Sequence, residues 1–578
     1  MRLQTALILL ILPYFSGCGT TTESTEQVNS VTVRLAQNPE TLNPVSYVNQ
    51  YTIRVGNFIY QSLLTIDHRT NGIRPQLAVD LPTVEAVDSG FLYHYQIRPE
   101  AYWDPEHPVT SEDIAFTIKL FYLPGINNTK SSVDYQFIRG MVPHESDPKR
   151  FAIYCESGAD DLRLLTGDFL VLPRHLYDPE NVTATWPLYE IVKGAVDTEG
   201  NKAYTRFSDR FNDPATSRDS SFMTGSHAYR MVAWETDKFI TLERKKPWWG
   251  DELPESSGIK GKPDRIVFLV IPDNNTALLM LKAGKLDVMD NISSSDFKQL
   301  KKNETFLQDY DLHSPSSYRF VYIGLNDRLP KLADKGTRQA LAHLLDVPQI
   351  IELNEYGIAR QSTGMISPAD STHYNPDIPP YPFDKDKARQ LLQAAGWTYK
   401  GNAWTRQRGG TSQKLSFTIT YNSGTPSYEN IALILQEAAN SIGIHTELQP
   451  VEGAVLSESL RNHDFELSIG ALRGNPFAYD FRPILHTDAS GKGDFNYTGF
   501  GNAESDSLVD AIVVDTSSVN RVNYIYRLQE ILHEEANIIY LYFIQDKIAI
   551  HNRFKNVTIS AMPPGYDLMN FTLKEEED

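Results

Sequence analysis

Residues 273–289, Asp-Asn-Asn-Thr-Ala-Leu-Leu-Met-Leu-Lys-Ala-Gly-Lys-Leu-Asp-Val-Met, hold the pattern that decides the fold class. Asp273 is a good N-cap, and the apolar residues after it fall on one face of a helix. Gly284 ends that helix, because glycine adopts the left-handed conformation without a Cβ clash. The segment Leu286-Asp-Val-Met289 then returns as a strand. The stretch predicts a helix followed directly by a strand, which is the building unit of an α/β fold.

The same order of helix, glycine and strand returns later in the chain. We expect a helix from Asp386 to Ala395 before Gly396, and another from Glu429 to Ile442 before Gly443 and a strand at 444–448. No repeat period or low-complexity block interrupts this pattern. We therefore expect an α/β protein with a continuous globular body. Three further expected elements are a strand at 31–35, a helix that follows the capping box 110–113, and a helix at 337–345.

The first thirty residues are organised like an export signal followed by a tether. A basic start precedes a short apolar run, which is too short to span a bilayer as a mature helix. Phe15-Ser16-Gly17-Cys18 resembles the lipobox of bacterial lipoproteins, in which the cysteine becomes the lipidated N-terminus. We expect residues 1–17 to be a signal peptide and residues 18–30 to be the lipidated cysteine and a polar tether. An ordinary signal peptide with an incidental cysteine is the alternative.

Composition excludes some partners. The formal net charge is −19 and the C-terminal tail is acidic, which argues against nucleic acid and against an anionic membrane surface. No segment after the signal has eighteen consecutive apolar residues. One cysteine, Cys155, remains in the mature chain, so no internal disulfide is possible, and we expect a buried, non-catalytic thiol. We expect an extracytoplasmic monomer without a cofactor, held on a bacterial membrane only by the lipid on Cys18.

Several separated segments resemble, in order, the signature of extracytoplasmic solute-binding protein family 5, the oligopeptide-, dipeptide- and nickel-binding proteins of ABC importers. Each segment is weak evidence alone, but their order over most of the mature chain is specific. The matching segments are Asn38-Pro-Glu-Thr-Leu-Asn-Pro44 with 59–64, then 75–80, 91–98, Tyr102-Trp103, 108–114, 225–229, 283–288, 322–326 with 338–341, and 387–392 with 395–396. Four residues in and near them are interpreted as framework that fixes turns and caps: Arg98, Trp103, Asp113 and Arg338.

The resemblance implies a two-lobed periplasmic-binding-protein type II fold with an extra subdomain, whose lobes close on the ligand about a hinge. The chain would cross the hinge twice, near 311–313 and near 538–543. Two crossings restrict the motion to a hinge. The expected boundaries are 31–58, 215–307 and 541–578 for lobe I, 59–214 for the extra subdomain, and 308–540 for lobe II.

In peptide-binding members the ligand lies extended and pairs its backbone with strand segments of both lobes, so binding tolerates many side chains. The resemblance places one pairing edge on each lobe. The candidate ligand-binding residues are Tyr47, Val48 and Asn49 on lobe I, and Ala471, Leu472, Arg473, Asn475, Tyr479 and Asp480 on lobe II.

The lobe II edge departs from the family's pattern. Peptide binders carry a Trp and then an Asp that accepts the peptide's ammonium group in a charge-assisted bond. Ala471 and Gly474 stand at those two positions. Two alternatives are open: Asp480 supplies the carboxylate from a displaced position, or Arg473 makes the site favour a carboxylate or a phosphate.

Two other classes of function compete with peptide capture. An enzyme is disfavoured, because the chain lacks G-x-S-x-G, H-E-x-x-H, a phosphate-cradling glycine loop and C-x-x-C. Its histidines never fall at metal-ligand spacing, so a metal or hydrolase site would need distant segments. The other rival keeps the fold but binds an oligosaccharide, a metal chelate or a signalling peptide. The sequence predicts a non-catalytic lipoprotein that captures peptides for the transmembrane subunits of an ABC permease, and the resemblance implies that these are oligopeptides.

Overall fold

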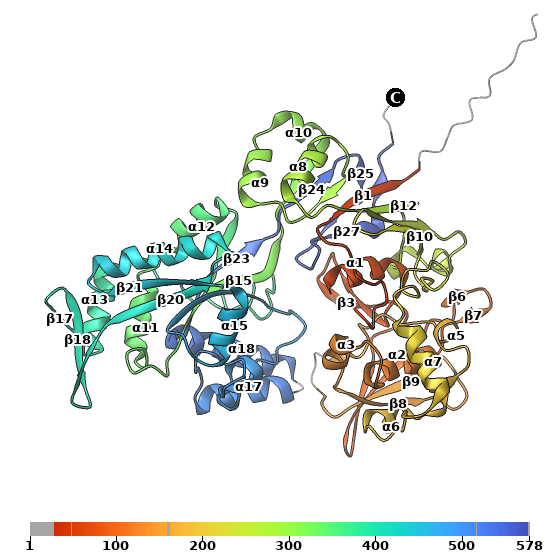
Figure 1. The fold of residues 1–578 in the computed structure, drawn as a ribbon, viewed down its shortest axis with the longest axis horizontal. Coiled ribbons are helices and arrows are strands. Elements are labelled where there is room, and N and C mark those ends of the chain that lie inside the picture. The colour runs from red at the N-terminus through yellow and green to blue at the C-terminus, as the bar shows by residue number, and fades with distance from the viewer. Residues whose placement is uncertain (1–27, 48, 159–161, 516, 576–578) are drawn as a thin grey trace, which may run out of the picture.

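Two large sheets divide the chain into two lobes (Figure 1). The computed structural model describes residues 28–47, 49–158, 162–515 and 517–575. We call the described residues up to His313 and from Ile548 onward lobe I, and residues 316–545 lobe II. The sheet of lobe I has the order β10 (Tyr229–Glu235), β11 (Phe239–Arg244), β12 (Arg265–Val270), β1 (Ser30–Leu35), β13 (Val288–Met289), β24 (Ile548–His551) and β14 (Tyr310–His313). The sheet of lobe II has the order β16 (Ala359–Gln361), β23 (Ile538–Gln545), β15 (Ser316–Leu325), β22 (Leu467–Arg473), β20 (Ser416–Asn422) and β21 (His445–Val451).

The stretch 273–289 folds as its sequence predicts. Asp273 caps α8 by accepting a hydrogen bond of 2.7 Å from the backbone N–H of Thr276, and Gly284 follows the helix with a φ of +68°. Strand β13 then lies parallel to β1 in the lobe I sheet. The remaining helices and short strands of this part of lobe I are α1 (Gln50–Ile59), α8 (Asn274–Lys282), α9 (Ser294–Leu300), α10 (Glu304–Asp309), β25 (Phe554–Lys555), β26 (Thr558–Ile559), β27 (Tyr566–Asp567) and β28 (Thr572–Leu573).

Residues 59–214 add a second layer to lobe I, around a four-stranded sheet of order β4-β5-β9-β8. The capping box at its main helix is confirmed: Asp113 accepts a hydrogen bond of 2.9 Å from the backbone N–H of Thr110. The elements of this layer are β2 (Leu64–Asp67), β3 (Gly72–Pro75), β4 (Thr83–Val87), β5 (Gly90–Gln96), β6 (Tyr102–Asp104), β7 (His107–Pro108), α2 (Ser111–Tyr122), α3 (Thr129–Asp134), β8 (Ile138–Pro143), β9 (Arg150–Cys155), α4 (Leu162–Leu165), α5 (Arg174–Tyr177), α6 (Leu188–Val192) and α7 (Lys202–Asn212).

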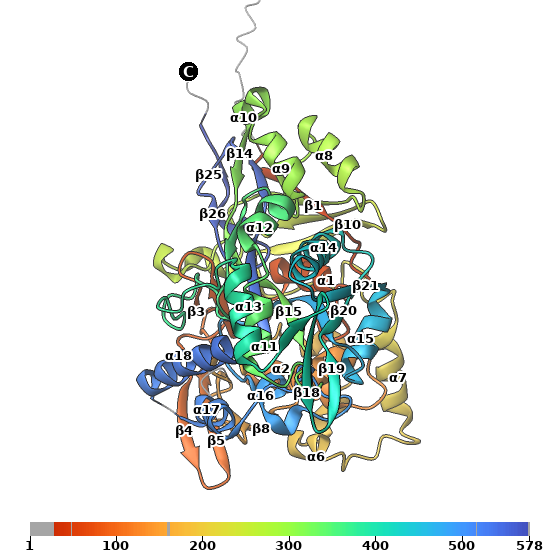
Figure 2. The same ribbon diagram turned by 90° about the vertical axis from the view of Figure 1, so that its left-hand side faces the viewer.

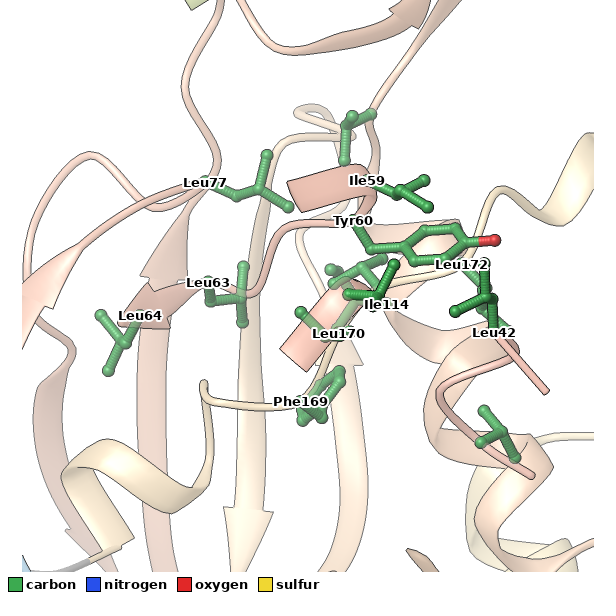
Figure 3. Packing of buried hydrophobic residues seen from close by; sticks show 14 of the residues in the cluster. Leu42, Ile59, Tyr60, Leu63, Leu64, Leu77, Ile114, Phe169, Leu170 and Leu172 are labelled. Atoms are coloured by element: carbon green, nitrogen blue, oxygen red, sulfur yellow. The ribbon is translucent and has the colours of Figure 1, made fainter. Parts of the chain in front are cut away.

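This second layer shares one apolar core with the main sheet of lobe I. Val33 of β1 and Phe268 of β12 belong to the same buried cluster as Ile114 of α2 and Phe169. Figure 3 shows the side chain of Tyr60, which follows α1, near those of Ile114 and Leu172 in this cluster. A continuous core of this size resists separation of the layers, so residues 59–214 move with lobe I as one body.

Helices cover the lobe II sheet, and two of them confirm the predicted helix–glycine–strand units. The helix expected from Glu429 begins earlier, at Pro426, because a proline at the first turn loses no helical hydrogen bond. In Figures 1 and 2 α11 and α13 lie side by side. The remaining lobe II elements are α11 (Lys335–Ala342), α12 (Val347–Glu355), α13 (Lys385–Ala394), β17 (Thr398–Lys400), β18 (Ala403–Arg408), β19 (Thr411–Lys414), α14 (Pro426–Ser441), α15 (Gly453–Arg461), α16 (Arg482–Leu485), α17 (Ala503–Val514) and α18 (Ser518–Glu535).

Strand pairing shows where the chain crosses between the two large sheets. β14 pairs with β24 in lobe I, so the chain leaves lobe I at Ser314 and Pro315, after the boundary expected at 308. β23 pairs with β15 as far as Gln545, so the chain returns at Asp546 and Lys547, after the boundary expected at 541. The apolar run that forms β23 continues almost into β24, and composition alone cannot separate the two strands.

A buried ion pair lies at the second crossing. Lys547 donates a bond of 2.7 Å to Glu355 at the end of α12 in lobe II. The same carboxylate accepts a hydrogen bond of 2.7 Å from Ser294 of α9 in lobe I. Both charged side chains are buried, so Glu355 ties the crossing segment to both lobes.

The residues interpreted as framework have structural contacts. Arg338 is buried, pairs with Glu535 at 2.8 Å and donates to the carbonyl of Leu332. Arg98 donates to the carbonyl of Gln76, and Trp103 is buried. Cys155 is a buried free thiol, as expected. Within the described ranges no helix is both long and apolar enough to cross a bilayer.

Candidate functional site

The lobe II segment chosen from the sequence forms the end of β22, which has one open edge. β22 pairs with β15 along its whole length, through Ala471 opposite Val321 and Leu472 opposite Phe320. On its other side β20 reaches only Leu467 and Ser468. From Ile469 to Arg473 that edge has no strand partner among the described residues. An extended ligand backbone can add there as a further strand.

Two arginines meet where β22 ends. Arg473 lies directly opposite Arg319 of β15, and both side chains are exposed. Neither guanidinium group donates a hydrogen bond to, or forms an ion pair with, any described residue. Asp546, in the second crossing, interacts with both arginines through its charge. Burial raises the pKa of Asp546, and Arg473 and Arg319 oppose that rise. The pair concentrates positive charge beside the open edge and matches a carboxylate or phosphate.

The residues that follow β22 are occupied within lobe II. The Tyr479 hydroxyl is buried and lies 2.9 Å from Nδ1 of His373, and it also contacts Asp370. The Asn475 side chain accepts a hydrogen bond of 3.0 Å from the backbone N–H of Phe477. Asp480 is held by Arg482 through two bonds of 2.8 and 2.6 Å. A carboxylate already paired in this way is a poor receptor for a second cation.

The lobe I residues chosen from the sequence have separate roles. Asn49 caps α1, because its Oδ1 accepts a hydrogen bond of 2.9 Å from the backbone N–H of Tyr51. The Tyr47 hydroxyl donates to Asp134 at the end of α3. Val48 lies outside the described residues. Figure 1 shows α3 at the margin of lobe I that faces lobe II.

An acidic cluster lies beside Tyr47. The Oδ1 atom of Asp168 is enclosed and has no hydrogen-bond partner among the described residues. Burial raises the pKa of Asp168 to about 7, and the negative charge of Asp134 adds to the rise, while Tyr135 opposes it. Burial and the neighbouring charge of Asp168 raise the pKa of Tyr135 in turn. The cluster brings the carboxyl groups of Asp134 and Asp168 together on lobe I.

The lobes touch through apolar side chains between the acidic cluster and the hinge. Phe477 of lobe II packs against the lobe I core and against Met562 of the C-terminal segment. Tyr318, which precedes Arg319 on β15, belongs to the same small cluster as Met562. Tyr318 therefore joins β15 to the contact between the lobes, while Arg319 points to the other face of the strand.

Sequence reasoning missed the partners that give the chosen residues their chemistry. Arg319 is the one cation in an otherwise apolar strand, and its exposed position in the alternating pattern was a usable signal. Asp134 and Asp168 carry no local signal, because they become neighbours only when α3 packs against the loop before α5. Nothing in the local sequence distinguishes them from surface carboxylates.

Comparisons with known proteins place this geometry in a family. The model of bacterial extracellular solute-binding proteins, family 5 (middle region), matches residues 72–493. The oligopeptide-binding protein AppA of Bacillus subtilis is 25% identical over 576 residues, covering 95% of each chain. Its structure with a nonapeptide has a TM-score of 0.64 at 21% identity and covers 94% of this chain and 99% of that chain. The structure of NikA of Brucella suis, in complex with Fe(III)-EDTA, has a TM-score of 0.72 at 19% identity. The match covers 94% of this chain and 100% of that chain. The structural likenesses confirm the expected fold.

Proposed function

Because the chain belongs to family 5 of the bacterial extracellular solute-binding proteins, which are non-catalytic components of transporters, we propose that it captures peptides between its lobes. The peptides, oligopeptides in particular, are then released unchanged to the transmembrane subunits of an ABC importer. The end-to-end similarity to an oligopeptide-binding relative supports this cargo. The observation that carries the proposal is the open edge of β22 from Ile469 to Arg473, which ends at two unpaired arginines.

The open edge supplies binding that does not depend on peptide sequence. Backbone N–H and C=O groups of an extended peptide pair with those of β22, and the peptide's side chains alternate between the two faces. Such pairing is the same for every residue except proline. It therefore suits a protein that captures peptides of varied composition.

The charged groups select the two ends of the peptide. We assign the peptide carboxylate to Arg319 and Arg473, which have no carboxylate bound to them. The ammonium group goes to the acidic cluster of Asp134 and Asp168 on the opposing lobe. Asp480, one of the two alternatives from the sequence, is neutralised by Arg482 and takes no part.

A metal chelate is the second candidate cargo. The Brucella suis relative of the same fold is in complex with Fe(III)-EDTA, a carboxylate-rich chelate. Two unpaired arginines suit the carboxylates of a chelator as well as they suit a peptide terminus. A chelate has no backbone to pair with β22, so the open edge favours the peptide.

Titration calorimetry with end-blocked peptides tests the assignment. The parent protein binds a free peptide, and amidation of the peptide's C-terminus weakens binding by about 1.5–3 kcal/mol, the range for a hydrogen bond to a charged group. Arg473→Ala weakens binding of the free peptide equally and abolishes the effect of amidation. Asp480→Asn is the matched control. It leaves the affinities for the free peptide and for the amidated peptide unchanged. Binding of chelates without binding of any peptide would move the proposal to the second cargo.

The remaining proposals concern location and motion. The lipid anchor is Cys18, which lies outside the described residues, and it holds the mature monomer on the outer side of a bacterial membrane. The lobes close about the crossings at Ser314–Pro315 and Asp546–Lys547. Small-angle scattering with and without peptide tests closure, because a closed protein has the smaller radius of gyration.

A further inference from the structure

Three side chains of metal-ligating type meet at the outer edge of lobe I. Asp104, His107 and His175 place one possible ligand atom each within 4.8 Å of the other two. Asp104 ends β6 and His107 begins β7, so a two-residue turn sets them opposite each other. His175 comes from α5, far along the chain. The histidines are dispersed in the sequence, and the fold brings two of them together.

The hairpin holds Asp104 and His107 in fixed positions. Oδ1 of Asp104 accepts hydrogen bonds of 2.9 and 3.1 Å from the backbone N–H groups of Glu106 and His107. Nδ1 of His107 lies 2.9 Å from Oδ1 and 3.1 Å from Oδ2 of the same carboxylate. Nε2 of His175 lies 3.9 Å from Oδ2. The two imidazole rings are stacked, with centroids 3.9 Å apart and an interplanar angle of 2°.

These distances are close to those of a three-ligand metal site. Bonds of about 2.1 Å in tetrahedral geometry separate neighbouring ligand atoms by roughly 3.4 Å. The spacing of 3.1 Å between His107 and Asp104 is already suitable. His175 has to approach Asp104 by about half an ångström, and its ring has to turn out of the stack with His107, because a bound ion lies in the plane of each imidazole. Two imidazoles and one carboxylate are ligands that zinc and neighbouring first-row ions accept.

We propose that Asp104, His107 and His175 bind one divalent first-row transition-metal ion, for which Zn²⁺ is the probe, with water in the fourth position. The proposal does not rest on the peptide-binding function. Figure 1 places β6, β7 and α5 on the side of lobe I that faces away from lobe II. An ion bound there joins the β6–β7 hairpin to α5. A hydrogen bond of 2.9 Å from the backbone N–H of Arg174 to Asp113 already holds α5 against α2.

Two cationic side chains near the cluster are engaged with other groups. Arg174 is turned toward Glu112, at 2.5 Å. The ammonium group of Lys245 donates to the backbone carbonyl of Gly225.

Calorimetry on the untagged mature protein, treated with EDTA and dialysed, tests the site with ZnCl₂. We expect one Zn²⁺ per chain, with binding weakened at least about tenfold in His107→Ala and in His175→Ala. His94→Ala is the matched control, because His94 is an exposed histidine of the same layer, paired with Glu85. Its zinc binding stays at the parent level. Zinc raises the unfolding temperature of the parent and the control but not of the two variants.

Cobalt(II) gives an independent readout of the ligands. Bound to the parent, Co²⁺ in a tetrahedral site shows intense visible absorption, and His175→Gln loses that band while its circular dichroism in EDTA matches the parent. Absence of zinc binding to the parent overturns the proposal. So does zinc binding that survives both histidine replacements, because the ion then lies elsewhere.

Discussion

Replacing the buried carboxylate of Asp168 by its neutral amide, Asp168→Asn, should stabilise the protein in a pH-dependent way. In the folded protein burial raises the pKa of this carboxyl to about 7 from an ordinary value of 3.8. In the unfolded chain it ionises at the ordinary value. Between pH 4 and pH 7 the unfolded chain therefore binds fewer protons at this site than the folded protein, and stability falls as the pH rises.

The size of the effect follows from that difference in pKa. Each unit of pKa difference corresponds to about 1.36 kcal/mol, so by pH 8 this site lowers the free energy of unfolding by up to about 4 kcal/mol. Relaxation around the charge reduces this, so we expect Asp168→Asn to be more stable than the parent by about 1–4 kcal/mol at pH 8 and equal to it near pH 4.

Urea unfolding at pH 4, 6 and 8, followed by circular dichroism, measures the difference. Asp197→Asn, an exposed site in the same layer, is the matched control and should follow the parent at every pH. The reasoning fails if the difference in free energy of unfolding between Asp168→Asn and the parent is the same at pH 4, 6 and 8. A second check is function: Asp168→Asn should bind a free peptide more weakly than the parent but bind an N-acetylated peptide equally well.

Three further predictions concern the opposite lobe, the hinge and the anchor. Arg473→Ala should shorten the residence of a free peptide in stopped-flow displacement by tenfold or more, while Asp480→Asn matches the parent; equal rates in all three would remove Arg473 from the site. Lys547→Met should lower the free energy of unfolding by about 3–5 kcal/mol, because it leaves Glu355 buried without its cation, and a double replacement with Glu355→Gln should recover part of that loss. Cys18→Ser should move the folded protein from the membrane to the soluble fraction of the cell envelope, and unchanged membrane association would contradict the lipid anchor.

Local sequence signals predicted the elements well, because caps and glycine stops act over a few residues. Asp273, Asp113 and Gly284 each have the predicted role, and each depends only on near neighbours. β23 belongs to the lobe II sheet and β24 to the lobe I sheet because of the strands with which they pair. Those partners are distant in the sequence, so local signals do not place the boundary between the lobes.

The candidate site was predictable in outline but not in its charges. The resemblance led to the end of β22, yet the pairing of Arg473 with Arg319 depends on strand register. Whether Arg473 or Asp480 can bind a peptide terminus depends on whether its side chain already forms an ion pair with a neighbouring residue. Asp480 is held by Arg482, two residues away, whereas Arg473 has a second cation opposite it. Such partners are set by tertiary structure, which composition and spacing do not encode.

The identity of the bound cargo tests the central claim most directly. Protein purified from its native envelope without added ligand is denatured, and the released small molecules are identified by liquid chromatography and mass spectrometry. We predict peptides of varied sequence, and a chosen peptide added back should be recovered unmodified after binding. Release of haem, a metal chelate or a sugar in place of peptides, or recovery of a cleaved peptide, would contradict the account.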